Sequence, residues 1–262
     1  IVPLLTWGLI TFPLWMSPFH PAIVAYFIIG FDLYFFYKSL TNAVYATISY
    51  KKILNYSHVN FAKKLNQLPR AKDIKHFTII PNYKEPLYKI EETIDLLTKN
   101  DLPSKNQYLV LAFEKREKEA ESKAAILRKK YAAYFTDIIV TYHQLQPGEI
   151  IGKASNQTYA ARIISQYAQE QQIAAEDILI TDCDADSHLP TNYFSYLTYE
   201  YLNDKDRLYH FYWAPVLPYN NFWHIPFFVR IQSTLSSILR LSLLSEKENL
   251  IQNSTYSTNL WL

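Results

Sequence analysis

The strongest constraint on this chain lies in its first 37 residues, which contain a single charged side chain, Asp32. A proline-containing turn separates two apolar stretches, residues 1–16 and 19–37. The second stretch is long enough to cross a hydrocarbon core of about 30 Å as a helix. Neither stretch has the charged start and small-residue cleavage site of a signal peptide. We therefore predict two transmembrane helices in residues 1–37.

The net charge of +2 hides a strong segregation, because residues 38–75 hold eight basic side chains against the single acid Asp73. Basic residues that directly follow a membrane span place that end on the cytoplasmic side. Lysines and apolar residues alternate between Ser39 and Asn66, which suits a helix lying on the membrane surface. An ordinary linker helix with a solvated basic face remains the alternative. In either case residues 38–75 form a basic amphipathic linker, and residues 76–262 are expected in the cytoplasm.

From residue 76 onward, short apolar runs alternate with longer amphipathic stretches. This order predicts an α/β domain with a mostly parallel sheet that is flanked by helices. Expected strands are residues 77–80, 108–113, 137–141, 178–181 and 208–213. Expected helices begin near Leu87, Ala120 and Lys153, where apolar residues recur at helical spacing. A lone cysteine, Cys183, excludes an internal disulfide.

Ligands of such sheets bind beyond the carboxyl ends of the strands, so the residues that follow each strand are the candidates for a site. The first strand is followed by a turn with Tyr83 and Glu85, where a ring and a carboxylate can contact a nucleoside. The acid Glu114 follows the second strand. Gly152 and Lys153 open a helix, where a lysine can meet a phosphate. Each feature alone is also compatible with an ordinary surface turn.

Three acids in five residues, Asp182, Asp184 and Asp186, follow the fourth apolar run. Crowded carboxylates repel one another unless a cation offsets their charge. Oxygen ligands without nearby Cys or His clusters suit Mg²⁺ or Mn²⁺. An EF-hand is excluded because its glycine and glutamate positions hold Ser187 and Tyr193.

Taken together, these residues resemble the family 2 glycosyltransferases, in the membrane-embedded branch that includes cellulose and hyaluronan synthases. The matching motifs are Pro81-Asn82-Tyr83-Lys84-Glu85, Gly152-Lys153-Ala154 and Asp184-Ala185-Asp186, in the order of that family. The resemblance covers about residues 76–262. It implies a GT-A catalytic domain, which is Rossmann-like, and which is truncated here at its C-terminal side.

The resemblance also implies roles for individual residues. The nucleotide-sugar site would comprise Pro81, Tyr83, Glu85, Glu114, Lys153 and Asp184. Asp184 and Asp186 would bind the metal, Mg²⁺ or Mn²⁺, and Asp182 would either join them or cap the loop.

The implied activity is an inverting transfer of a sugar from a nucleotide-diphosphate sugar, expected to be a UDP-sugar, to a glycan or lipid-linked acceptor. Expected partners are this donor, the acceptor and membrane lipids, and no nucleic acid. The protein would be an integral protein of a bacterial plasma membrane, with its catalytic domain in the cytoplasm. The aspartate that acts as catalytic base in the family has no counterpart here, and we expect it downstream of Leu262.

Two other functions stay open. A GT-A-like nucleotidyltransferase would share the sheet and the acids, although this chain lacks the glycine-rich phosphate loop of those enzymes. A membrane-anchored scaffold with a degenerate nucleotide-sugar site is the other alternative. Residues 226–244 are apolar but carry two arginines, which favours an amphipathic helix near the membrane surface over a third membrane span.

Overall fold

The fold was determined as a computed structural model, which describes residues 1–246 and 255–261. The chain divides into two compact units. We call Ile1–Leu54 with Leu217–Ile251 the helical unit, and Asn55–Val216 with Gln252–Leu262 the sheet unit. This division differs from the predicted segments 1–37, 38–75 and 76–262, because residues after 216 group with the N-terminal helices.

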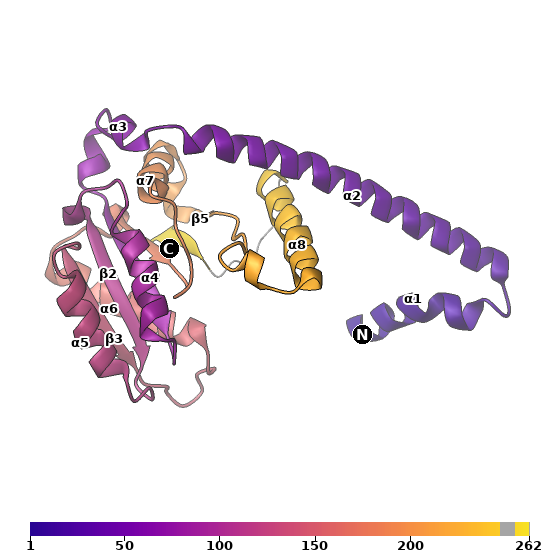
Figure 1. The fold of residues 1–262 in the computed structure, drawn as a ribbon, viewed down its shortest axis with the longest axis horizontal. Helices are drawn as coiled ribbons and strands as arrows, with labels where there is room; N and C mark the ends of the chain where they lie inside the picture. Colours follow the sequence, from indigo (N-terminus) through magenta and orange to yellow (C-terminus); the bar gives the residue numbers. More distant parts are fainter. Residues whose placement is uncertain (247–254, 262) are drawn as a thin grey trace. The chain divides into compact units, whose positions relative to one another are not determined.

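The sheet unit is built on six strands in the order β3-β2-β1-β4-β6-β5 (Figure 1). The strands are β1 (Lys75–Asn82), β2 (Gln107–Glu114), β3 (Asp137–His143), β4 (Ile178–Asp182), β5 (Phe211–Trp213) and β6 (Tyr256–Asn259). The neighbours among β3, β2, β1 and β4 pair in parallel, whereas β6 pairs antiparallel with both β4 and β5. The predicted α/β class with a mostly parallel sheet is confirmed.

Helices cover both faces of this sheet. They are α4 (Leu87–Leu97), α5 (Ala120–Tyr131), α6 (Lys153–Glu170) and α7 (Tyr193–Asn203). Because side chains alternate along a strand, Leu109 and Leu111 pack under α4 and α5, whereas Val110 packs with Ile164 of α6 on the opposite face. Figure 1 shows α4 and α5 in front of the sheet and α6 behind it.

Short helical segments complete the described part of the sheet unit before β6. They are α3 (Phe61–Leu65), η1 (Pro69–Lys72), η2 (Ser104–Asn106), η3 (Ala175–Asp177) and η4 (Arg207–Tyr209). The strand predicted at residues 208–213 is wrong in its first part, because η4 occupies residues up to Tyr209 and β5 begins only at Phe211.

The helical unit contains α1 (Val2–Met16), η5 (Phe222–His224), α8 (Phe227–Ser245) and most of α2 (Pro21–Ser57). Among the described residues, α2 is the helix long and apolar enough to span a membrane, and its apolar part is almost entirely exposed. The prediction of two spanning helices is not confirmed, because the 15 residues of α1 extend about 22 Å, less than the roughly 30 Å of a hydrocarbon core.

The predicted boundary between a span ending at residue 37 and a separate basic linker falls inside a single helix. Figure 1 shows α2 as one unbroken helix that continues to Ser57. Its proline and glycine residues are Pro21, at its start, and Gly30. Neither lies near residue 38, so nothing in the sequence interrupts the backbone hydrogen bonds there. The basic residues Lys38, Lys51 and Lys52 therefore belong to the same helix as the apolar stretch and do not form a separate linker.

Candidate functional site

A pocket of about 270 Å³ lies at the carboxyl ends of β1, β2 and β4. The chain leaves β1 for β2 on one side and returns to β4 on the other, so the order of strands reverses here, and ligands bind at such points in open α/β sheets. The pocket is lined by Pro81, Asn82, Tyr83, Glu85, Glu114, Arg116, Gly152, Lys153, Asn156, Asp184, Ala185 and Asp186.

The sequence-predicted site residues come together in this pocket from four separate segments. Those that line it are Pro81, Tyr83, Glu85, Glu114, Lys153, Asp184 and Asp186. The exception is Asp182, which is the last residue of β4, is buried and does not line the pocket. What these residues bind stays a prediction.

One wall of the pocket is the aromatic ring of Tyr83, with two cations close to it. The Arg116 guanidinium lies 4.2 Å from the centre of the Tyr83 ring, and the Lys84 ammonium lies 5.0 Å from it. Arg116 Nε is also 3.6 Å from Glu114 Oε2. Cations over a ring face are attracted by its quadrupole, so these contacts fix the orientation of a half-exposed ring.

The turn that carries Tyr83 and Glu85 is held by a buried ion pair. Lys84 has φ of 62°, in the left-handed region that is unfavourable for residues with a side chain. Its backbone N–H donates to Glu117 Oε2 over 2.9 Å. Lys123 Nζ donates to Glu117 Oε1 over 2.6 Å and to the Glu85 carbonyl over 2.8 Å. Glu117 and Lys123 thus satisfy the backbone of a turn that would otherwise be strained.

On the opposite wall, one lysine neutralises two aspartates. Lys153 Nζ lies 2.5 Å from Asp184 Oδ1 and 3.1 Å from Asp182 Oδ2. Burial raises the pKa of Asp182 to about 6, and the Lys153 charge opposes this rise. Burial lowers the pKa of Lys153, but the charges of Asp182 and Asp184 outweigh it and raise the pKa above its usual value. Lys153 therefore remains a cation at the pocket.

The acidic loop after β4 offers few ligands for a metal ion. Within residues 1–246 and 255–261, no group of three or more His, Cys, Asp or Glu side chains is placed to hold one. Two carboxylates, Asp184 and Asp186, do line the pocket. Mg²⁺ commonly takes one or two carboxylates and completes its shell with water and substrate phosphates. These two carboxylates fit a metal that is bound together with a nucleotide, and whether Asp182, which does not line the pocket, joins them stays a prediction.

The loop before Lys153 is tied to the end of β2 through a buried histidine. His143 lies with Nδ1 3.4 Å from Glu114 Oε1 and with Nε2 3.1 Å from Glu149 Oε2. Glu149 Oε2 also accepts from the Gln146 backbone N–H over 2.8 Å, which lowers the pKa of Glu149. His143 thereby links Glu114, which lines the pocket, to Glu149 in the loop that leads into α6.

Two buried asparagines line the pocket and were missed by sequence reasoning. Both side-chain polar atoms of Asn82 have no hydrogen-bond partner among the described residues, although the residue is only 3% exposed. Asn156 donates to the Ala112 carbonyl over 2.8 Å, but its Oδ1 has no partner within the same residues. Buried polar atoms are nearly always paired, so unpaired ones that line a pocket indicate a polar ligand.

Sequence reasoning also missed Arg116, Glu117 and Lys123. They lie in the charged run Glu114–Lys123, whose composition is typical of a solvent-exposed first turn of a helix. The signal that could have found them is the position of that run directly after the second strand, at the edge where ligands bind.

No protein-family model matches the chain, and no curated protein sequence matches it. Among solved structures, the mannosyltransferase PcManGT from Pyrobaculum calidifontis in complex with GDP-Man and Mn²⁺ is similar, with a TM-score of 0.47 and 14% sequence identity. The match covers 83% of this chain and 56% of the mannosyltransferase, so this chain spans just over half of that protein's length. A likeness this slight carries no argument about function.

Proposed function

We propose that this protein binds a nucleotide-diphosphate sugar together with Mg²⁺ or Mn²⁺ and transfers the sugar with inversion. The observation that carries the proposal is the pocket itself. It gathers aromatic, acidic and basic side chains from four segments at the switch point of the sheet, and it presents the amide of Asn82, which has no partner within residues 1–246 and 255–261. The similarity to PcManGT agrees with this proposal but does not support it independently.

The proposed roles follow from the chemistry of each wall. The Tyr83 ring packs on the nucleobase, and Glu85 and Glu114 accept hydrogen bonds from the base or the ribose hydroxyls. Lys153 exchanges its bond to Asp184 for one to the diphosphate, which frees Asp184 for the metal beside Asp186. When bound, the metal supplies positive charge that stabilises the leaving nucleoside diphosphate. Lys153 would add a second positive charge beside the diphosphate.

The acceptor and the location of the reaction are part of the same proposal. We propose a glycan or lipid-linked acceptor, and a sheet unit on the cytoplasmic side of a membrane that α2 spans. The basic residues on the C-terminal half of α2 support this orientation, since such residues are retained on the cytoplasmic side. We assign no described residue as the base that takes the proton from the acceptor.

Calorimetry on the full chain in detergent tests the donor site. We expect UDP or GDP to bind in the presence of Mn²⁺ and to bind weakly with a chelator. Asp186→Ala should abolish the metal-dependent part of the binding, because one of two carboxylate ligands is lost. Asp206→Ala removes an exposed acid outside the pocket and is the matched control.

Three outcomes would contradict the proposal in different ways. Binding of neither nucleotide would exclude a nucleotide-sugar site. Binding without release of nucleoside diphosphate from any sugar donor, even with membranes as acceptor, would favour a non-catalytic scaffold. Release of pyrophosphate from a nucleoside triphosphate and a sugar phosphate would identify a nucleotidyltransferase.

A further inference from the structure

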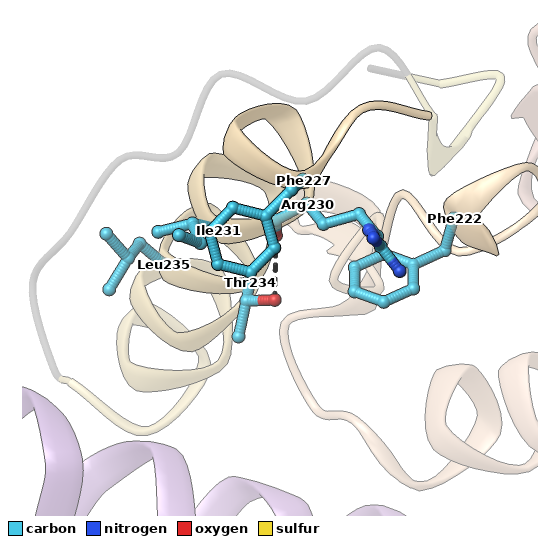
Figure 2. Close-up of a pocket in the computed structure, with 6 residues that line it drawn as sticks. All are labelled: Phe222, Phe227, Arg230, Ile231, Thr234 and Leu235. Atoms are coloured by element: carbon cyan, nitrogen blue, oxygen red, sulfur yellow. Dashed lines mark hydrogen bonds between the residues drawn. The ribbon is translucent and has the colours of Figure 1, made fainter. Parts of the chain in front are cut away.

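A second pocket, of about 450 Å³, lies within the helical unit between η5 and the first turns of α8. Its lining is shown in Figure 2 and consists of Phe222, Phe227, Arg230, Ile231, Thr234 and Leu235. Its volume is in the range of small-molecule sites. None of these residues belongs to the pocket of the sheet unit.

The lining combines one cation with apolar walls. Thr234 adds no free donor, since its hydroxyl donates to the Arg230 carbonyl over 2.9 Å. Figure 2 shows the Arg230 side chain extending toward Phe222 and away from Ile231 and Leu235, so the charge lies at one end of the pocket and the aliphatic wall at the other. The pocket is therefore amphipathic.

Within the described residues, Arg230 forms no ion pair, and its buried Nε has no hydrogen-bond partner. Its guanidinium lies near a ring instead, with Cζ 5.9 Å from the centre of Trp223. Because the buried Nε lacks a partner among the same residues, an anion that accepts a hydrogen bond there would offset the cost of that burial. The planar fork of Arg suits a phosphate group in particular.

The distribution of polar and apolar side chains on α8 indicates that this pocket faces lipid. Its buried residues are the small polar Ser237 and Ser242, whereas large apolar side chains are exposed along it. Two serines of α8 contact α2: Ser242 donates to Asn42 over 3.3 Å, and Ser245 Oγ lies 2.6 Å from Ser49 Oγ. Small polar residues between helices and apolar residues outside are typical of helices in lipid.

We propose that this pocket binds an anionic phospholipid of the bilayer, with its phosphate on Arg230 and the start of an acyl chain along Ile231 and Leu235. The inference rests on the proposed membrane location of α2, and not on the proposed sugar transfer. A soluble anion would satisfy Arg230 but would leave the apolar wall uncovered, whereas a phospholipid matches both ends.

The test uses the full chain in nanodiscs made from equal parts of phosphatidylglycerol and phosphatidylcholine. After extraction in mild detergent, native mass spectrometry counts the retained molecules of each lipid. We expect preferential retention of phosphatidylglycerol, and Arg230→Ala should reduce that preference about fivefold, the effect of roughly one basic residue at a charged membrane. Arg230→Lys should keep most of it.

Two further variants distinguish the contribution of the Arg230 charge from that of the apolar wall. Arg240→Ala removes the other arginine of α8, which lies outside the pocket, and should leave the preference unchanged. Leu235→Ser should reduce the retention of both lipids, because it removes apolar wall without changing charge.

The outcomes distinguish the pocket from the membrane location. A chain that does not insert into nanodiscs overturns both proposals. A chain that inserts but shows the same lipid preference with and without Arg230 overturns the pocket alone. An equal effect of Arg230→Ala and Arg240→Ala would show diffuse attraction of charge, and displacement of the lipid by inorganic phosphate would show a simple anion site.

Discussion

The buried amide of Asn82 lowers the stability of the fold and is proposed to serve ligand binding, so the two effects can be separated by mutation. Its buried amide has no partner among the described residues, and such a group costs about 1–3 kcal/mol of desolvation. We expect Asn82→Ala to leave the free energy of unfolding unchanged or to raise it by about 1 kcal/mol, while nucleotide binding weakens. Chemical denaturation and calorimetry on the same samples measure the two effects. A variant that is destabilised and binds normally would show that the amide serves the fold.

His76 is a second buried residue with a measurable signature. Burial lowers its pKa from 6.5 to about 3, and its Nε2 lies 2.8 Å from the Thr198 hydroxyl, so the folded protein keeps this ring neutral. The unfolded chain takes up the proton below about pH 6.5 and the folded chain does not. Stability from this residue is therefore complete above pH 6.5 and falls as the pH decreases toward 3.

The expected slope is about 1.4 kcal/mol per pH unit at most. Other groups titrate in the same range, so the comparison is with His76→Gln, which retains a polar side chain but cannot be protonated. Urea unfolding between about pH 7 and pH 4 should show a shallower loss of stability in the variant, by roughly one proton. Parallel curves for the two proteins would mean that His76 is protonated in the folded state.

At the scale of elements, the turn after β1 is held by Glu117, just before α5, and by Lys123 in the first turn of α5. Removing one partner of a buried ion pair leaves an uncompensated charge and costs about 3–5 kcal/mol. We expect Glu117→Gln or Lys123→Met to lower the free energy of unfolding by an amount in this range. The control is Lys130→Met, also on α5, which removes an exposed pair with Glu91 of α4 and should change stability little.

The double variant Glu117→Leu with Lys123→Met separates positioning from stability. An apolar pair can replace a buried ion pair with little cost, so much of the stability should return. Nucleotide binding should stay weak, because the Lys84 N–H and the Glu85 carbonyl still lack their partners. Normal binding by the double variant would show that the pair serves only the fold.

Elements with a strong pattern could be predicted from the sequence, and those built from polar residues could not. The parallel strands and the helices α4, α5 and α6 follow from apolar periodicity. β6 was not predicted, because Tyr256–Asn259 has no apolar alternation. Its buried polar side chains pair instead, with Ser257 2.8 Å from Thr181 and Asn259 donating to the Ile178 carbonyl.

The site shows the same limit. The gathering of Tyr83, Glu85, Lys153, Asp184 and Asp186 in one pocket could be predicted because each lies in a segment that follows a strand. Asn82 could not, since an asparagine at the end of a strand becomes unusual only when its burial and its missing partners are known. The two apolar stretches also suggested two spans, whereas the structure has a short α1 and a long α2 that continues past the apolar residues.

At the scale of the whole molecule, α2 links the two units, because it begins in the helical unit and its last residues belong to the sheet unit. If α2 spans the membrane, a charge in its apolar part should oppose insertion. We expect Ile29→Arg to reduce the fraction of chain that resists carbonate extraction, at a cost of about 2.5–3.5 kcal/mol at the centre of a span. Asn55→Arg, at the polar end of the same helix, should have no such effect.

The orientation of α2 is tested by labelling. Cys183 is buried and is the sole cysteine, so Cys183→Ser gives a background without thiols, onto which Lys52→Cys adds one on the basic part of α2. Because the basic residues favour the cytoplasmic side, a membrane-impermeant maleimide should label this thiol only after the cells are permeabilised. Phe19→Cys, in the turn before α2, should be labelled in intact cells. The reverse pattern would place the sheet unit outside, away from cytoplasmic nucleotide sugars, and would contradict the proposed reaction.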